Sequence, residues 1–164
     1  MGSLPDFDRN GYLPPGIHAT SLAEVVKRFG AASKVRNKQA ELLRQVVEAA
    51  KAYTTIKRVL VWGSFVTAKL EPADIDFSIV VSITHWRTKL NDEHRRFFVP
   101  YEARLRYGVD RGYLIIPDYP LDIYIEFLDF LCHTRTKREY GIVEINIRGE
   151  TTSNNGRVNR DDSK

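Results

Sequence analysis

The stretch VLVWGSFVTAKLEPADIDFSIVV, residues Val59–Val81, decides the fold of this chain. It contains two apolar, β-branched runs that are separated by Gly63-Ser64 and a short polar segment. Each run has the length and composition of a buried strand, and we predict strands over Arg58–Trp62 and Ile75–Val81. The glycine then lies in the turn after the first strand, and a short helix should begin near Phe65.

Two carboxylates interrupt the second apolar run. Asp74 and Asp76 are two residues apart, so their side chains should project from the same face of the strand. Such neighbours repel each other, and burying an unpaired carboxylate is costly, so a cation is expected between them. Magnesium suits the pair because it prefers carboxylate oxygens and completes its shell with water and phosphates. The alternative is a pair of half-exposed acids on an edge strand.

The Gly63-Ser64 turn predicts a phosphate-binding site beside this metal site. A glycine lets backbone N–H groups approach an anion closely, and the serine adds a hydroxyl. Lys69, between the two halves of the stretch, could contact a phosphate, although a lysine in such a segment is more often only solvated.

The rest of the chain predicts one domain. Apolar periodicity indicates helices over 22–29, 33–53 and 91–107, the last kinked at Pro100, and strands over 109–116 and 140–147. Residues 121–131 suit a helix, though a strand is also compatible. We expect an N-terminal arm over 1–20, a domain over 21–148 and a polar, mobile tail over 149–164.

Composition narrows the class of protein. The 164 residues, 43% of them hydrophobic, suffice for one core, and the net charge of +4 favours anionic ligands. The basic residues are spread along the chain, so nucleic acid is an unexpected partner, and the absence of a long apolar span argues against a membrane partner. Cys132 is the single cysteine, which predicts core packing and a cytoplasmic location. The four histidines lack the spacing of zinc ligands.

Gly63-Ser64, nine intervening residues and Asp74-x-Asp76 together resemble the motif of the DNA polymerase β-like nucleotidyltransferase superfamily, especially its minimal bacterial members. The opening FDRNGYLPPGIHATSLAEV and the late YGIVEINI resemble an uncharacterised bacterial family assigned to that superfamily. The resemblance implies an α+β fold, with a small mixed β-sheet flanked by helices. It also implies that the Gly-Ser turn holds a nucleoside triphosphate while the Asp pair ligates two Mg²⁺ ions.

A third carboxylate is implied on a later strand, and Asp110 in RYGVDRGYLII stands at the expected place. Minimal members commonly have an apolar residue next, whereas this chain has Arg111. Asp122 and Glu126 are rival candidates, with solvated positions on an amphipathic helix as their alternative interpretation.

The resemblance implies transfer of a nucleoside monophosphate, AMP in minimal members, from a triphosphate to a hydroxyl, with Asp110 as general base. Minimal members often act as antitoxins that modify a tyrosine of a toxin partner, and by analogy we expect a protein acceptor here. The alternative is a catalytically inactive binding or regulatory subunit with the same fold, which Arg111 favours. Nucleic-acid binding through the basic helices ranks last.

Overall fold

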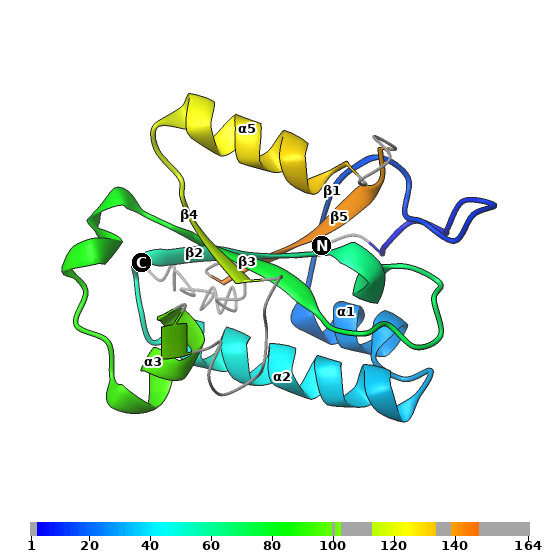
Figure 1. The fold of residues 1–164 in the computed structure, drawn as a ribbon, viewed down its shortest axis with the longest axis horizontal. Coiled ribbons are helices and arrows are strands. Elements are labelled where there is room, and N and C mark those ends of the chain that lie inside the picture. Colours follow the sequence, from blue (N-terminus) through cyan, green and yellow to red (C-terminus); the bar gives the residue numbers. More distant parts are fainter. Residues whose placement is uncertain (1–2, 100, 103–112, 134–138, 148–164) are drawn as a thin grey trace, which may run out of the picture.

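The computed structural model describes residues 3–99, 101–102, 113–133 and 139–147, which form a mixed sheet with helices on both faces (Figure 1). This is the α+β fold that was predicted. The strand order is β1-β5-β2-β3-β4. The strands are β1 (Gly16–Thr20), β2 (Ile56–Trp62), β3 (Asp76–Val81), β4 (Tyr113–Pro117) and β5 (Gly141–Asn146).

The two strands predicted in the 59–81 stretch pair with each other inside the sheet. β2 and β3 run antiparallel, and their ladder ends where Trp62 pairs with Asp76. β3 also pairs in parallel with β4, with Phe77 opposite Tyr113. The end of β3 that carries Asp76 therefore lies beside the start of β4.

Helices α1 (Leu22–Phe29), α2 (Lys34–Lys51) and α3 (Asp92–Phe98) lie on one face of the sheet, and α5 (Leu121–Leu131) lies on the other (Figure 1). Serine caps start the first two: the Ser21 hydroxyl accepts from the Glu24 N–H at 3.2 Å, and Ser33 accepts from Arg36 at 3.2 Å. In the part of the chain that the structure describes, every helix is too short or too polar to span a bilayer.

Alternation along the strands divides the buried residues between two cores. Phe77, Ile79 and Val81 share one face of β3, toward α1, α2 and α3, and belong to the larger core. A smaller core lies under α5 and consists of Leu60, Val80, Ile116, Tyr124, Leu131, Tyr140 and Ile142. Asp76 and Ser78, which alternate with the larger-core residues of β3, face the α5 side.

The predicted N-terminal arm contributes a strand to this sheet. Its last five residues form β1, which pairs in parallel with β5 from Gly16 opposite Gly141 onward. Pro14 and Pro15 stop the strand from starting earlier, because proline lacks the donor that a ladder needs. Before the prolines, the arm is anchored by Leu13, which is 1% exposed and accepts from the Gly141 N–H at 3.0 Å.

The bounds of the later elements follow the predictions where the structure describes them. Residues 121–131 form a helix, and β5 matches the strand predicted over 140–147. α3 covers the first part of the helix predicted over 91–107, and β4 covers the second part of the strand predicted over 109–116. Residues 149–164, the predicted tail, lie outside the described residues.

Candidate functional site

The Asp76 carboxylate packs directly against the backbone of Gly63. A Cβ atom added to Gly63 would lie 1.9 Å from Oδ2 of Asp76, and Gly63 has a φ of +70°. Both facts require glycine, because a side chain would clash and would strain the backbone. Gly63 of the Gly-Ser motif and Asp76 of the Asp pair are therefore in contact.

Burial and a like charge disfavour the ionised form of Asp76. Burial, and to a lesser extent the negative charge of Asp74, together raise the pKa of this carboxyl from 3.8 to about 6. The two carboxylates are thus close enough to repel each other. A divalent cation bound by both would relieve this repulsion, so the donor set fits a hard metal ion such as Mg²⁺.

Asp74 does not share a strand face with Asp76, contrary to the prediction: the strand was expected from Ile75, and β3 begins at Asp76. Asp74 lies in a bend before β3 and is exposed, whereas Asp76 is partly buried. The strand begins only at Asp76 because its partner β2 ends at Trp62, after which Gly63 turns the chain away. Asp74 therefore has more conformational freedom than a ladder residue.

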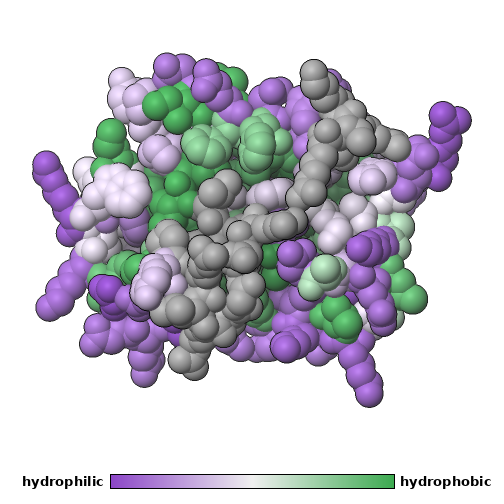
Figure 2. Space-filling view, in the orientation of Figure 1, coloured by the Kyte–Doolittle hydropathy of each residue, from purple (hydrophilic) through white to green (hydrophobic). Residues whose placement is uncertain are grey.

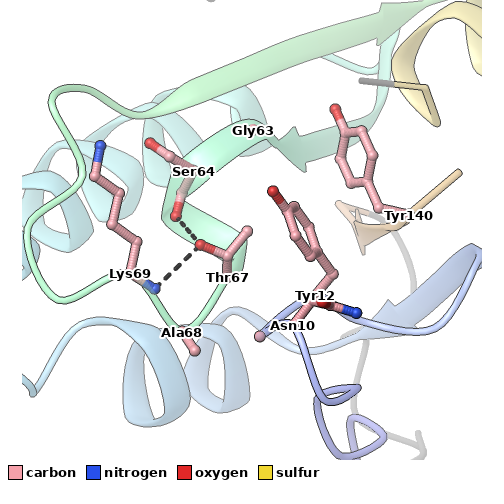
Figure 3. Close-up of a pocket in the computed structure, with 9 residues that line it drawn as sticks. Asn10, Tyr12, Gly63, Ser64, Thr67, Ala68, Lys69 and Tyr140 are labelled. Atoms are coloured by element: carbon pink, nitrogen blue, oxygen red, sulfur yellow. Dashed lines mark hydrogen bonds between the residues drawn. The ribbon is translucent and has the colours of Figure 1, made fainter. Parts of the chain in front are cut away.

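Ser64 lies in a short 3₁₀ helix, Gly63–Val66, that starts two residues before the predicted Phe65. The Thr67 hydroxyl donates to the Ser64 carbonyl oxygen at 2.8 Å and accepts from the Lys69 N–H at 3.2 Å. This pair of bonds closes the loop after the Gly-Ser turn and brings Lys69 back beside Ser64 (Figure 3).

Arg36, a residue that sequence analysis did not single out, holds this loop from α2. Its side chain is 3% exposed, and burial lowers the pKa of its guanidinium. The guanidinium donates to four backbone carbonyl oxygens, those of Phe29 at 3.0 Å, Phe65 at 2.8 Å, Thr67 at 2.8 Å and Lys69 at 2.9 Å. The backbone of residues 65–69 is therefore held by one charged side chain rather than by a regular ladder.

A pocket of about 560 Å³ opens at the Gly-Ser turn (Figure 3). Gly63, Ser64 and Lys69, the residues predicted to bind phosphate, all line it. Its other lining residues are Asn10, Gly11, Tyr12, Thr67, Ala68 and Tyr140. In Figure 3 the Ser64 hydroxyl and the Lys69 ammonium group point to the same side, as a shared anionic ligand would require.

The arm supplies one wall of this pocket. The Ala68 N–H donates to the Gly11 carbonyl oxygen at 2.8 Å, which ties the arm to the loop after the Gly-Ser turn. The Asp8 carboxylate accepts from the backbone of Asn10 at 2.8 Å and of Tyr12 at 3.0 Å, and so shapes the tight turn between them.

Tyr140, just before β5, lines the pocket and lies near Asp76. Its ring is 6.1 Å from that of Tyr12, measured between centroids. Burial and the charge of Asp76 raise the pKa of Tyr140 to about 12, against the opposite effect of a hydrogen bond from the Gly63 backbone. The Tyr140 hydroxyl is therefore protonated at neutral pH. No local pattern in the sequence distinguishes it from the other tyrosines.

The remaining predicted site residues fall elsewhere. Asp110 lies outside the described residues, and within the described ranges no group of three or more acids, histidines and cysteines is placed to hold a metal ion. Asp122 and Glu126 are exposed on α5, whereas Tyr124 of the same helix packs on the sheet. Asp122 and Glu126 are therefore not placed together with Asp76. They are solvated residues of an amphipathic helix, which was the alternative interpretation of these two acids.

Comparison with known proteins places the chain only at the level of a family. The model of a family of unknown function, DUF6932, matches residues 5–146, which include the arm, the pocket and the Asp pair. No curated protein and no solved structure matches the chain.

Proposed function

We propose that this chain, which belongs to the DUF6932 family, is a metal-dependent nucleotidyltransferase. The reaction is transfer of a nucleoside monophosphate, AMP in our proposal, from a nucleoside triphosphate to a hydroxyl, with release of pyrophosphate. We place it in the cytoplasm. The single observation that carries the proposal is the contact between Gly63 of the Gly-Ser turn and Asp76 of the acid pair, which supports a shared site for phosphate and metal.

Different residues of the pocket can bind different parts of the substrate. Ser64 and Lys69 offer a hydroxyl and an ammonium group to the β- and γ-phosphates, and the backbone at Gly63 leaves room for close approach. The Arg36 bonds keep this loop in one conformation before the substrate arrives. Prior ordering of this kind lowers the entropic cost of positioning a triphosphate.

Asp74 and Asp76 would hold Mg²⁺, with Asp110 as the proposed third ligand. When bound, two such ions neutralise the charge that develops on the α-phosphate and the leaving pyrophosphate. Asp110 is also our candidate for the general base that accepts the proton of the acceptor hydroxyl. Tyr140, protonated beside Asp76, can donate a hydrogen bond to an oxygen at the reacting centre.

We propose that the acceptor is a tyrosine of a partner protein, as in the toxin–antitoxin pairs of minimal members of the superfamily. Almost all described residues belong to the sheet, its covering helices or the loops that join them. The described residues therefore contain no separate acceptor-binding domain.

The test combines two assays on the full chain. Titration calorimetry should show binding of ATP, GTP, CTP or UTP that depends on Mg²⁺, and a pyrophosphate assay should show release when a host lysate supplies the acceptor. The D74N/D76N variant should lose both signals, whereas E41Q, which changes an exposed acid of α2 away from the pocket, should keep them.

Three outcomes separate the candidates. Binding with pyrophosphate release and a labelled protein band after incubation with α-phosphate-labelled ATP supports the transferase. Nucleotide binding without any release assigns the inactive binding subunit instead. No heat with any of the four triphosphates in the presence of Mg²⁺ refutes both.

A further inference from the structure

The outer face of α5 is apolar and acidic at the same time. Four large apolar side chains of this helix are well exposed, namely Leu121 at 58%, Ile123 at 41%, Ile125 at 55% and Phe130 at 63%. Figure 2 shows hydrophobic residues gathered along the upper edge of the molecule, where α5 lies, with hydrophilic residues among them. A helix of a folded domain normally turns such residues toward the core.

Helical geometry orders the residues of α5 into one buried row and three exposed rows. Tyr124 and Leu131 face the sheet and are buried. On the opposite side, the period of 3.6 residues places Asp122, Glu126 and Asp129 in one exposed row. One apolar pair, Leu121 and Ile125, flanks this row on one side, and the pair Ile123 and Phe130 flanks it on the other.

Two of the three acids in this row have no ion-pair partner among the described residues. Asp122 and Glu126 form no ion pair with any residue that the structure describes, and the carboxylate of Asp129 is 3.7 Å from the His133 ring. Neither acid serves the proposed active site. The combination of exposed apolar side chains and unpaired negative charge on one helix face is typical of a recognition surface.

The charge decides what can cover this face. A nucleic acid or an anionic membrane surface would bring more negative charge to the acid row. A second copy of the chain, docked through the same face, would set two acid rows against each other. We propose that the outer face of α5 docks a partner protein through an amphipathic helix, whose row of Lys or Arg residues lies between two apolar rows.

This inference does not depend on the proposed function, and its test uses no nucleotide. Two fluorescein-labelled helical peptides share one leucine pattern, and their polar positions carry lysine in one peptide and glutamate in the other. Fluorescence anisotropy measures binding of each peptide to the full chain at physiological salt. The wild-type protein should bind the lysine peptide and not the glutamate peptide.

Variants on and off the face show where the peptide binds. I125S/F130S should weaken the lysine peptide by about tenfold or more, because it removes one apolar side chain from each flank. D122K/E126K/D129K should reverse the preference and bind the glutamate peptide. W86S removes a side chain that is 67% exposed but outside α5, and it should bind like the wild type.

The proposal is overturned if the wild-type protein binds neither peptide, or binds both equally. It is also overturned if W86S loses as much affinity as I125S/F130S. A wild-type dimer in light scattering that F130S converts to a monomer would assign the face to a second copy. All substituted side chains are exposed, so folding should persist, and the comparison of the two peptides on the wild-type chain stands without any variant.

Discussion

Asp76→Asn should make the metal-free protein more stable at neutral pH. The pKa of this carboxyl is 3.8 without the protein environment and about 6 in the fold. This difference in pKa corresponds to a free-energy penalty of about 3 kcal/mol for ionising Asp76 in the folded protein relative to the unfolded chain. Because Asp76 is only partly buried, solvent screening reduces the expected gain in the free energy of unfolding to about 1–2 kcal/mol. Asparagine keeps the shape and has no charge to bury.

The sign of the effect depends on pH in a defined way. Between about pH 4 and pH 6 the folded protein keeps the Asp76 proton, which the unfolded chain releases, so this residue lowers stability as the pH rises. His85 acts in the opposite direction, because burial lowers its pKa and its protonation opposes folding at acid pH. The difference between variant and wild type isolates the contribution of Asp76.

The assay is urea unfolding in EDTA, followed by circular dichroism, at about pH 4 and about pH 7.5. The D76N variant should gain about 1–2 kcal/mol at the higher pH and almost nothing at the lower pH. E126Q, an exposed acid on α5, serves as control and should change stability by less than about 0.5 kcal/mol. The burial argument is refuted if D76N gains nothing at neutral pH, or gains equally at both pH values.

Magnesium gives the same variant a second readout. If Asp74 and Asp76 hold Mg²⁺, the ion should stabilise the wild-type protein by an amount that grows with its concentration. The D76N variant should lack this gain. A wild-type midpoint that does not move with Mg²⁺ would leave the carboxylate pair without its proposed ion.

Three further predictions concern the scaffold and the lone thiol. G63A should lower the free energy of unfolding by about 1–2 kcal/mol because of the positive φ alone, and by more because the new side chain would clash with Asp76. In a D76A background only the cost of the backbone conformation should remain, which a double-mutant cycle by urea unfolding can measure. R36M should cost about 3 kcal/mol or more because it leaves four carbonyl oxygens without their donor, and R36K should recover only part of that loss in the same assay. Burial and the nearby acids Asp129 and Glu139 raise the pKa of the Cys132 thiol, so its reaction with a disulfide reagent at neutral pH should be about tenfold or more faster in denaturant than in the folded protein.

Local patterns predicted the elements whose neighbours are close in sequence. Strands β2 and β3 and helix α1 follow from the apolar periodicity within each segment, whereas the periodicity of 121–131 was compatible with a helix or a strand. The Gly63-Ser64 turn was also predictable, because a glycine that ends an apolar run marks a tight turn. Its neighbour Phe65 is fully buried in the core.

The features that local sequence patterns did not predict depend on contacts with residues that are distant in the sequence. Gly16–Thr20 becomes a strand only because β5 offers it an edge. Asp74 falls outside β3 because the partner strand stops at Trp62, a limit that its own segment does not encode. Arg36 and Tyr140 reach the site from distant segments, and an arginine on a helix or a tyrosine before a strand is ordinary in isolation.

The pairing of β1 with β5 bears on how the molecule is made. During synthesis β1 leaves the ribosome before every other described strand, and its partner β5 leaves after all of them. β5 also lies between β1 and β2, so the hairpin cannot join the first strand earlier. Contacts this distant in sequence are slow to form. The nascent chain therefore cannot assemble the pocket, with Tyr12 on one side and Tyr140 on the other, until translation of the domain is almost finished.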